Sequence, residues 1–459
     1  MGVMEISRSY RGELEVVSPL HVGSGSFDSR DGIPGATGAN KAPQVALIMR
    51  DGDNNPYIPG TTIKGLLRRL FDDQDVEFMA GEIKDSEVEG GRMGAVMVRG
   101  ARFLAAGPTE ALPFTEKLDK TEVGEGVFVA ARTAIDDETG TVADAKLFFQ
   151  EMVAPKSVFS FEVVVAPHAR STITDAGAKL EAALRQLAGM DGVSIGKGQA
   201  DGFGRIRIKG GKLITRSRTI DTTSGEVTDG QPKTVALTAD PRPAAFTISF
   251  SCPGPFIIAD ASRGKEHKPG ESKEDRKKGE AHSRPQKLGA DLPLILGSSV
   301  SGALRARAEW LAAVLNLAIP DEKGLIADAR HLPKDPVNQL FGVTGYRGLL
   351  SIRGMDVSTA KLWDVTSVQL DRFSGAPVDN ALFTTEVFVG ARFSITFGID
   401  ARGKADPALP WRERLDAASV RLLDALIDDL RTNGLQIGAG GNKGFGWFDA
   451  DVVEGGQNG

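Results

Sequence analysis

In two stretches of the chain, the spacing of the hydrophobic residues changes from a helical to a strand pattern. In residues 176–190, Leu180, Leu184 and Leu187 fall at positions i, i+4 and i+7, so this segment is predicted to form an amphipathic helix. Further on, Phe203, Ile206 and Ile208 alternate with polar or basic residues, which predicts a strand. Residues 416–430 repeat the helical pattern and are followed by a second strand pattern.

Four glycines lie between the first helix and its strand, in the sequence "IGKGQADGFG" (195–204). A dinucleotide-binding loop has its glycines between a strand and a helix, in the order G-x-G-x-x-G. Here the element order is reversed and the spacing differs, and no G-K-[ST] follows, so neither a Rossmann turn nor a Walker loop is predicted. The glycines fit either a tight helix-to-strand connection or a backbone that approaches a phosphate chain closely.

The glycine loop and two further segments occur twice, in the same order. Residues 195–204 match "IGAGGNKGFG" (437–446), and "YIPGTTIKGLLRRL" (57–70) matches "LILGSSVSGALRAR" (294–307). Between them, residues 134–151 match residues 369–386. Three matched segments in one order indicate a tandem duplication.

Each half reads as strand, helix, strands, helix and strand. This order predicts an α+β fold of two tandem ferredoxin-like (RRM-like) domains, each with insertions. The first domain is expected over 1–214 and the second over 244–459. Residues 215–243, rich in Thr, Asp and Pro, are expected to be the linker.

Composition limits the cellular setting. The chain has 459 residues, a net charge of −6 and one cysteine, Cys252. A single cysteine excludes a disulfide within the chain and a cysteine-cluster zinc site, and it fits a reducing compartment. The longest apolar run is too short to span a bilayer, so we expect a cytoplasmic protein without membrane contact.

The duplicated segments resemble the RAMP superfamily of CRISPR-associated proteins. A helix, a G-x-G-x-x-x-G-F-G loop and a strand are similar to the glycine-rich loop of that superfamily. "PYIPGTTIKGLLRRL", "ARTAIDDETGTVADAKLFFQE" and "HVGSG" resemble the helix start, the thumb hairpin and the strand-end loop of the backbone subunits (the Cas seven family) of type III effector complexes. The tandem arrangement is similar to the fused double subunits of variant type III-D systems.

This resemblance implies a role in antiviral defence as part of a ribonucleoprotein. Its implied partners are a CRISPR guide RNA, a complementary target RNA and other RAMP-type subunits. It further implies a filament subunit whose thumbs interrupt the guide–target duplex. An aspartate in the strand-end loop would support endoribonuclease (hydrolase) activity on the target RNA, with Mg²⁺ or Mn²⁺ as the divalent cation. A catalytically silent RNA-binding scaffold is the alternative, and a guide-processing endoribonuclease that uses His21 is a third.

The candidate RNA contacts are glycines and basic residues of the repeated segments. They are Lys64, Arg68, Arg305, Gly196, Lys197, Gly198, Gly202, Gly204, Gly438, Gly440, Lys443 and Gly444. A solvated helix face is the alternative for Lys64 and Arg68. The thumb candidates are Ile135, Asp136, Leu370 and Asp371, of which the two aspartates also fit simple turn positions.

The candidate catalytic residues are Asp28 and Asp260. A carboxylate beside an RNA 2′-OH can hold a divalent ion or assist proton transfer, so Asp28 is also the candidate metal ligand. In the second half, Asp260 is the nearest acid, but the glycines that precede Asp28 are missing there. His21 ends the first strand and fits either a structural histidine or the base of the third alternative.

Overall fold

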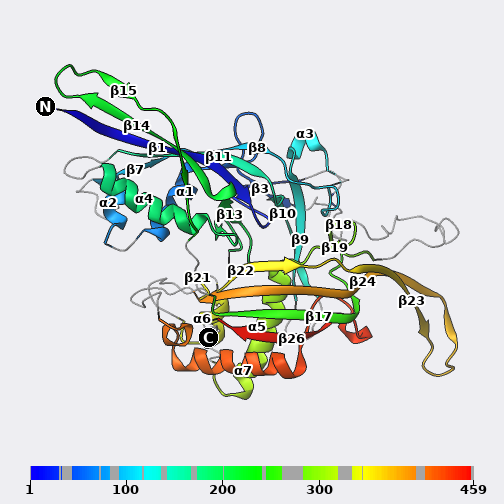
Figure 1. Cartoon of the computed structure of the whole chain (residues 1–459). Helices are drawn as coiled ribbons and strands as arrows, with labels where there is room; N and C mark the ends of the chain where they lie inside the picture. Colours follow the sequence, from blue (N-terminus) through cyan, green and yellow to red (C-terminus); the bar gives the residue numbers. More distant parts are fainter. Residues whose placement is uncertain are drawn as a thin grey trace.

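The chain folds into two halves, each a sheet with helices on one of its faces (Figure 1). The computed structural model describes residues 2–29, 33, 44–71, 74–82, 92–115, 118–135, 142–166, 173–199, 201–239, 244–260, 283–318, 333–343, 345–399 and 409–455. The helices are α1 (Gly60–Leu70), α2 (Val76–Ala80), α3 (Lys120–Val123), α4 (Ile173–Leu187), α5 (Gly297–Val314), α6 (Pro336–Phe341) and α7 (Ala417–Asn433).

The strands of the first half and of the connection run from β1 to β16. They are β1 (Val3–Val16), β2 (Gly23–Ser29), β3 (Gln44–Ile48), β4 (Tyr57–Ile58), β5 (Gly81–Glu82), β6 (Arg92–Met93), β7 (Val96–Val98), β8 (Ala101–Ala105), β9 (Val127–Ile135), β10 (Val142–Val153), β11 (Val158–Val165), β12 (Val193–Ser194), β13 (Arg205–Ile208), β14 (Lys212–Asp221), β15 (Val227–Asp229) and β16 (Lys233–Ala236).

The strands of the second half run from β17 to β26. They are β17 (Phe246–Phe256), β18 (Lys287–Gly289), β19 (Leu292–Pro293), β20 (Gly342–Val343), β21 (Tyr346–Arg347), β22 (Leu350–Val357), β23 (Lys361–Leu370), β24 (Pro377–Ile399), β25 (Leu435–Gln436) and β26 (Trp447–Glu454).

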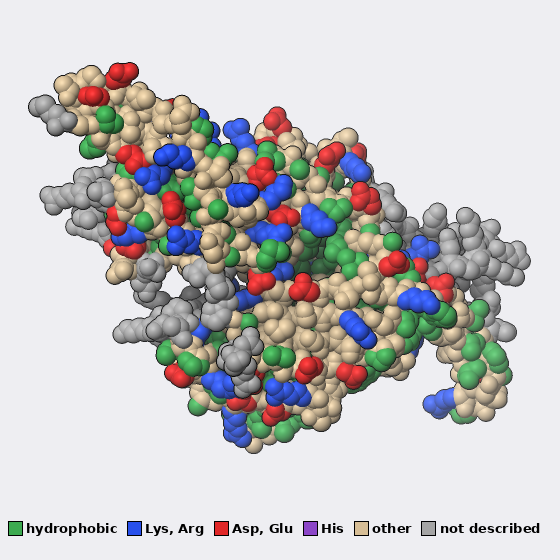
Figure 2. All heavy atoms as spheres, viewed as in Figure 1, with side chains coloured by type: hydrophobic (Ala, Val, Ile, Leu, Met, Phe, Trp, Pro, Cys, Tyr) green, Lys and Arg blue, Asp and Glu red, His purple; other side chains and the backbone are tan. Residues whose placement is uncertain are grey.

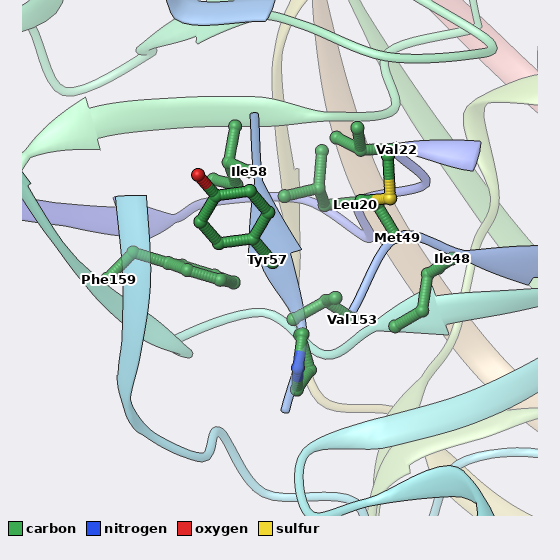
Figure 3. Close-up of a pocket in the computed structure, with 9 residues that line it drawn as sticks. Leu20, Val22, Ile48, Met49, Tyr57, Ile58, Val153 and Phe159 are labelled. Carbon is green, nitrogen blue, oxygen red and sulfur yellow. The ribbon is translucent and has the colours of Figure 1, made fainter. Parts of the chain in front are cut away.

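β1 lies at the centre of the first sheet, whose order is β12-β13-β1-β11-β8-β4. Leu14 pairs with Phe159 of β11 on one side and with Ile208 of β13 on the other. Helix α4 packs on this sheet and buries the three leucines that the sequence pattern placed on one face, which confirms that predicted helix. A cavity of about 10 Å³ lies between Leu20, Tyr57 and Phe159, and Figure 3 shows the side chains that line it. It has room for about one water molecule, which is too little for a ligand.

The second sheet has the order β22-β24-β17-β26-β25, so its central strands follow the same sequence of connections. Phe246, Ile248 and Phe250 alternate toward the core, as predicted from their spacing, and all three are buried. Helices α5 and α7 pack on this core (Figure 1). The two halves therefore have separate hydrophobic cores built on one plan.

Residues 215–243, expected to be a linker, contain strands. Most of β14 pairs with β1 over Val3 to Arg11, and β15 and β16 pair with β14. The segment connects the two halves and at the same time widens the first sheet, because β13 pairs only with Leu14 to Val16 of β1 and leaves the rest of that edge open to a further strand.

The two halves are joined through the first glycine loop. An apolar cluster combines Phe128, Met152 and Phe203 of the first half with Leu294 and Leu296 of the second. Beside it, the Arg205 guanidinium donates to the backbone oxygen of Arg353, and the Arg347 guanidinium donates to Gln199 Oε1 at 3.1 Å. We call these contacts the joint.

Candidate RNA interface

The two glycine-rich loops have the same backbone geometry. The Lys197 N–H donates to the carbonyl of His21 at 3.0 Å, and at the equivalent position the Ala439 N–H donates to the carbonyl of Ile257 at 2.9 Å. Gly196 and Gly438 have φ values of +72° and +88°, a region that other L-residues rarely adopt. A Cβ atom on either glycine would also collide with these same carbonyl oxygens. Each loop is therefore a tight connection that docks on the end of its central strand.

A group of cations and one aromatic ring lies beside the first glycine loop. The Phe148 ring on β10 is 41% exposed. The Lys197 ammonium lies 5.8 Å from its centroid and the Arg132 guanidinium lies 5.6 Å from it. Arg132 also pairs with Asp201 at 2.8 Å, which holds it in place. An exposed ring between two cations offers a base a stacking surface and its phosphate a counter-charge. We call Lys197, Phe148 and Arg132 the cation–ring cluster.

The second half keeps the aromatic ring of this cluster but not the basic residues equivalent to Lys197 and Arg132. Phe383 occupies the position of Phe148 and is equally exposed, at 41%. Ala439 replaces Lys197, and Ser367, which pairs with Phe383, replaces Arg132. The duplication therefore preserved the shape of this surface but not its charge. The sequence pointed to Lys197 as an RNA contact but not to Arg132, which lies opposite Phe148 only because β9 pairs with β10.

Arg68 and Arg305 have the same intramolecular role in the two halves. The Arg68 guanidinium donates to the carbonyl of Gly81 at 2.8 Å, and that of Arg305 donates to the carbonyl of Gly342 at 2.6 Å. Gly81 and Gly342 are the C-caps of α2 and α6, so each arginine satisfies a carbonyl at the end of a short helix. Lys64, one turn before Arg68, is partly exposed. On the helix face predicted to bind phosphate, Arg68 thus already bonds to a backbone carbonyl of the protein, while Lys64 is partly exposed.

Asp28 and Asp260 lie in different environments. Asp28 is exposed on the edge strand β2, and its Oδ1 accepts from the Ser29 N–H at 2.8 Å. Asp260 is 3% exposed. Counted from the matching prolines Pro19 and Pro255, Asp260 is equivalent to Ser24 and not to Asp28. The two acids are therefore not at equivalent positions. The sequence alone did not show this, because the second half lacks the glycines that precede Asp28.

Asp28 offers a divalent ion the ligand oxygens of one carboxylate. Within the part of the chain that the structure describes, no three His, Cys, Asp or Glu residues are grouped to hold a metal. Mg²⁺ is commonly bound by one or two carboxylates together with substrate phosphates. Asp28 fits such a shared site and does not fit a metal cage made by the protein alone.

Asp28 and the cation–ring cluster lie in one small sheet, of order β2-β3-β10-β9, but not on one face of it. Asp28 pairs with Val45, and Val45 pairs with Phe149, so these three side chains belong to one row across the strands. Phe148 belongs to the next row, and adjacent rows point to opposite faces. An RNA strand that contacts both would have to pass around the edge strand β2.

His21 is buried at 4% exposure beneath the strand-end loop. Its Nδ1 lies 2.7 Å from the carbonyl oxygen of Glu151, and a Cβ on Gly23 would lie 2.9 Å from its Nε2. Burial lowers the pKa of the imidazole, against the opposing effect of the hydrogen bond to Glu151. The position is that of a structural histidine, because the side chain is buried and its Nδ1 is bonded to the backbone of Glu151.

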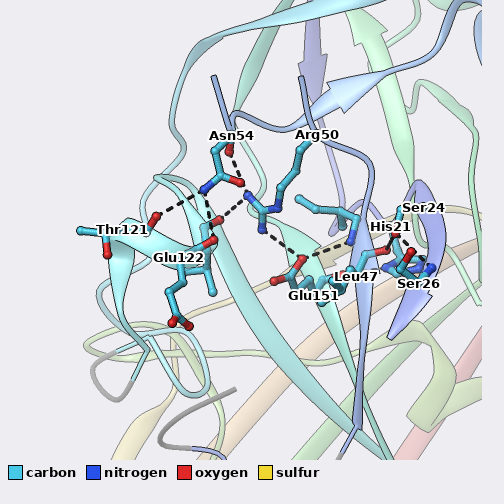
Figure 4. A network of polar contacts seen from close by, with 11 residues as sticks. His21, Ser24, Ser26, Leu47, Arg50, Asn54, Thr121, Glu122 and Glu151 are labelled. Carbon is cyan, nitrogen blue, oxygen red and sulfur yellow. Dashed lines mark hydrogen bonds and ion pairs between the residues drawn. The ribbon is translucent and has the colours of Figure 1, made fainter. Parts of the chain in front are cut away.

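A polar network holds the strand-end loop and the β9–β10 hairpin together (Figure 4). The buried Glu151 carboxylate accepts from Arg50 at 3.0 Å and from the Ile48 N–H at 3.1 Å. Arg50 also donates to the carbonyl of Val123 at 2.7 Å. In the second half, Lys287 and Glu386 form the corresponding ion pair at 2.9 Å. This network fixes the root of the hairpin that carries the cation–ring cluster.

The thumb candidates of the second half lie on a long ribbon of β23 and β24 that projects from the sheet (Figure 1). Leu370 is 57% exposed and Phe373, at the tip, is 84% exposed. Hydrophobic side chains extend along this arm in Figure 2. Asp371 accepts from the N–H groups of Phe373 and Ser374, which closes the tip turn and lowers the pKa of its carboxyl.

In the first half, Ile135 is the last residue of β9, and Asp136 lies outside the described residues.

Comparison with known families supplies the remaining observation. The sequence model of the RAMP superfamily matches residues 13–207 and again residues 221–449. The chain belongs to the RAMP superfamily. Both matched RAMP regions contain the two long helices and the glycine-rich loop of their half, and the first region begins within the central strand β1. No curated protein matches the chain as a relative.

Membership of the RAMP superfamily indicates a CRISPR-associated, RNA-binding subunit that works with other subunits. None of the helices in the described ranges is long and apolar enough to cross a membrane.

Proposed function

We propose that this double RAMP protein is a guide-RNA-binding backbone subunit of a type III CRISPR effector complex in the cytoplasm. Each RAMP region would correspond to one ferredoxin-like domain, and the strand order β13-β1-β11-β8 and its repeat in the second sheet support that assignment. Its partners would be the guide RNA, a complementary target RNA and other RAMP-type subunits. The tandem arrangement is similar to the fused double subunits of variant type III-D systems.

The observation that carries the RNA-binding role is the cation–ring cluster. Lys197, on the glycine loop, is exposed, and the Phe148 ring beside it is open to solvent. Nucleic-acid-binding grooves combine such charges, which track phosphates, with rings on which bases stack. The two glycine loops, Lys64, Lys443 and, beyond their capping role, Arg68 and Arg305 are the further proposed contacts.

The first experiment measures RNA binding by the purified chain across a salt series. Phe148→Ala should weaken binding by about 1–3 kcal/mol, because one stacked base is lost. Lys197→Ala should weaken binding to all sequences alike and make the salt dependence shallower by about one phosphate contact. Lys209→Ala is the matched control, since Lys209 is an exposed lysine paired with Glu13 and lies outside the cluster. Equal effects of Lys197→Ala and Lys209→Ala would remove the cluster from the RNA path.

We further propose target-RNA cleavage at Asp28. RNA carries its own nucleophile, the 2′-OH, so the protein need not supply a serine or cysteine. A Mg²⁺ or Mn²⁺ ion shared between Asp28 and phosphate oxygens would supply charge stabilisation at the scissile phosphate. The protein's own part would be to hold the strand and to place the Asp28 carboxylate beside it.

The second experiment follows cleavage of labelled complementary RNA by the assembled complex, with and without a chelator. Asp28→Ala should abolish one cleavage position and leave RNA binding and other positions intact. Asp53→Ala, which removes another exposed loop aspartate, serves as the control. Asp260→Ala tests a second position in the same assay.

A silent second half is the alternative that a specific observation favours. Asp260 is buried and is not equivalent to Asp28, so the second RAMP region would act as scaffold alone. Loss of a neighbouring cleavage position in Asp260→Ala, in a complex that assembles normally, would contradict this alternative. Cleavage that persists at every position in the Asp28→Ala, Asp260→Ala double variant would make the whole chain a scaffold.

A further inference from the structure

No described helix covers one face of the second sheet. Phe246, Ile248 and Phe250 of β17 point into the core, where α5 and α7 pack, so the residues between them point to the opposite face. Strand pairing arranges the polar residues of that opposite face in two rows across β22, β24, β17 and β26. We call these residues the serine–aspartate face: Asp356, Ser394, Ser249 and Asp451 form one row, and Arg392, Ser251 and Asp449 form the other.

The serine–aspartate face lines a groove of about 410 Å³. The floor of the groove is low, because the middle of the face consists largely of serines, which have small side chains. Asp356 and Asp451, at the two ends of one row, lie three strand spacings apart, which is roughly 14 Å at about 4.8 Å per strand. An α-helix with its side chains is about 10–12 Å wide. The groove is therefore wide enough for a segment of polypeptide.

The equivalent face of the first half carries ion pairs of its own. Arg207 pairs with Glu15 at 2.7 Å, and Lys209 pairs with Glu13 at 3.0 Å. In each pair the acid lies on β1, while the cation lies on β13 or directly after it. These pairs lie within the first half, outside the joint, and their four charges cancel.

The same four positions differ in charge in the second half. Counted from the matching glycine loops and from the matching prolines Pro19 and Pro255, aspartates stand where the first half has cations, and serines stand where it has acids. The equivalent pairs are Arg207 and Asp449, Lys209 and Asp451, Glu13 and Ser249, and Glu15 and Ser251. The sheet itself does not require these aspartates, because the first half builds the same sheet without them.

The aspartates of this face are not neutralised within the described part of the chain. Asp449, Asp451 and Arg392 are exposed, and no ion pair with a described residue includes any of them. Asp356 is exposed as well, and it interacts electrostatically with Arg205 of the first half. Three carboxylates against one guanidinium give the groove a net charge of −2. Such a surface repels the phosphates of RNA and attracts cationic groups.

We propose that the serine–aspartate face is the docking site of a protein segment rich in lysine and arginine that belongs to a partner of this chain. Asp449 and Asp451 would pair with its cations, and the serines of the floor would accept hydrogen bonds from it. Charge complementarity is the argument for this occupant. The inference goes beyond the proposed function, because the face includes neither the cation–ring cluster nor Asp28.

The first test is fluorescence anisotropy with the full chain, freed of nucleic acid by nuclease treatment. The probe is a fluorescein-labelled decapeptide of alternating lysine and serine. It should bind saturably, and more weakly as salt is added. Asp449→Arg with Asp451→Lys, which copies the residues of the first half, should raise the dissociation constant about 10-fold, because two attractive pairs become repulsive. A peptide that does not bind the wild-type chain overturns the proposal.

Two further variants separate the face from net charge and from misfolding. Glu125→Arg with Glu413→Lys makes the same change in net charge at two exposed acids outside the face, and it should change the dissociation constant less than about 2-fold, because salt screens distant charges. A loss as large in this control as in the face variant would reduce the binding to non-specific attraction and overturn the proposal. Adding Ser249→Glu and Ser251→Glu to the face variant restores the ion pairs of the first half. This variant should melt like the wild-type chain and still fail to bind.

The second test asks whether a protein or RNA occupies the face in the assembled complex. Carbodiimide joins a carboxylate directly to a lysine amine, so it should cross-link Asp449 or Asp451 to a lysine of another subunit, which mass spectrometry identifies. Labelled single-stranded RNA should bind the face variant at least as tightly as the wild-type chain. Weaker RNA binding by that variant, or the absence of any cross-link from the face to another subunit, would overturn the proposal.

Discussion

Single residues distinguish the two halves at positions where their backbones agree. The backbone hydrogen bond that the glycine loop makes to the strand end is the same in both halves, yet the residue that accepts it is His21 in one and Ile257 in the other. Both side chains are buried. His21 therefore places a titratable group in the first core at a position where the second core has an isoleucine. Burial lowers the pKa of this imidazole.

We therefore predict that His21 makes the first half sensitive to acid. Its pKa is lower in the folded chain than in the unfolded one, so the unfolded state binds more protons as the pH falls. The stability that depends on neutral His21 is complete above about pH 6.5 and decreases below it. His21→Ile, which copies the second half, should fold and should lose this part of the pH dependence in thermal melts between pH 5 and 8. An unchanged pH profile in His21→Ile would assign acid sensitivity to other groups.

At the scale of elements, each hairpin is tied by one ion pair to the segment before the first long helix of its half. Glu151 on β10 pairs with Arg50, and Glu386 on β24 pairs with Lys287. The pair in the first half is the more enclosed, since the Glu151 side chain is 0% exposed and that of Glu386 is 24% exposed. The ion pair has the same position in both halves, but its cation is an arginine in the first half and a lysine in the second.

We predict that Arg50→Met destabilises the chain by about 3–5 kcal/mol, because it leaves a buried carboxylate without its cation. Arg50→Lys should recover part of the loss, since a lysine serves at the equivalent position. Lys287→Met is the matched comparison and should cost less, because the Glu386 side chain is less enclosed than that of Glu151. Chemical denaturation of the three variants measures these differences. A loss as large in Lys287→Met as in Arg50→Met would contradict the role of burial.

At the scale of the whole molecule, the joint connects two cores that are otherwise separate. Leu294 and Leu296 belong to the second half but pack with Phe128 and Phe203 of the first half. Stability contributed by this cluster exists only while both halves are folded. The joint therefore couples the unfolding of one half to that of the other.

We predict that Leu296→Ala lowers the free energy of unfolding by about 2–5 kcal/mol, as is usual for a buried leucine. The same variant should separate one calorimetric transition into two, because the halves then unfold independently. Leu409→Ala, at a leucine that is 37% exposed, is the control and should change neither quantity appreciably. Two transitions in the wild-type chain would show that the joint does not couple the halves.

The sequence by itself determined the features that arise from local periodicity. The helix around Leu180, the alternating strand at Phe246 and the duplicated glycine loops follow from spacing and from the conformational freedom of glycine, both of which act over a few residues. The repeat order also predicted that the two halves share one plan, because equivalent segments of a duplication fold alike.

Only the tertiary structure decided how the candidate residues are used. Asp28 and Asp260 are both acids after a strand, yet one is exposed and the other is buried. Arg68 and Arg305 cap short helices that begin 8 and 31 residues downstream of them, at Val76 and Pro336. The expected linker pairs with β1, and Arg205 is covered while Trp447 is exposed. Each of these outcomes depends on contacts between residues far apart in the chain, and hydrophobic periodicity carries no record of such contacts.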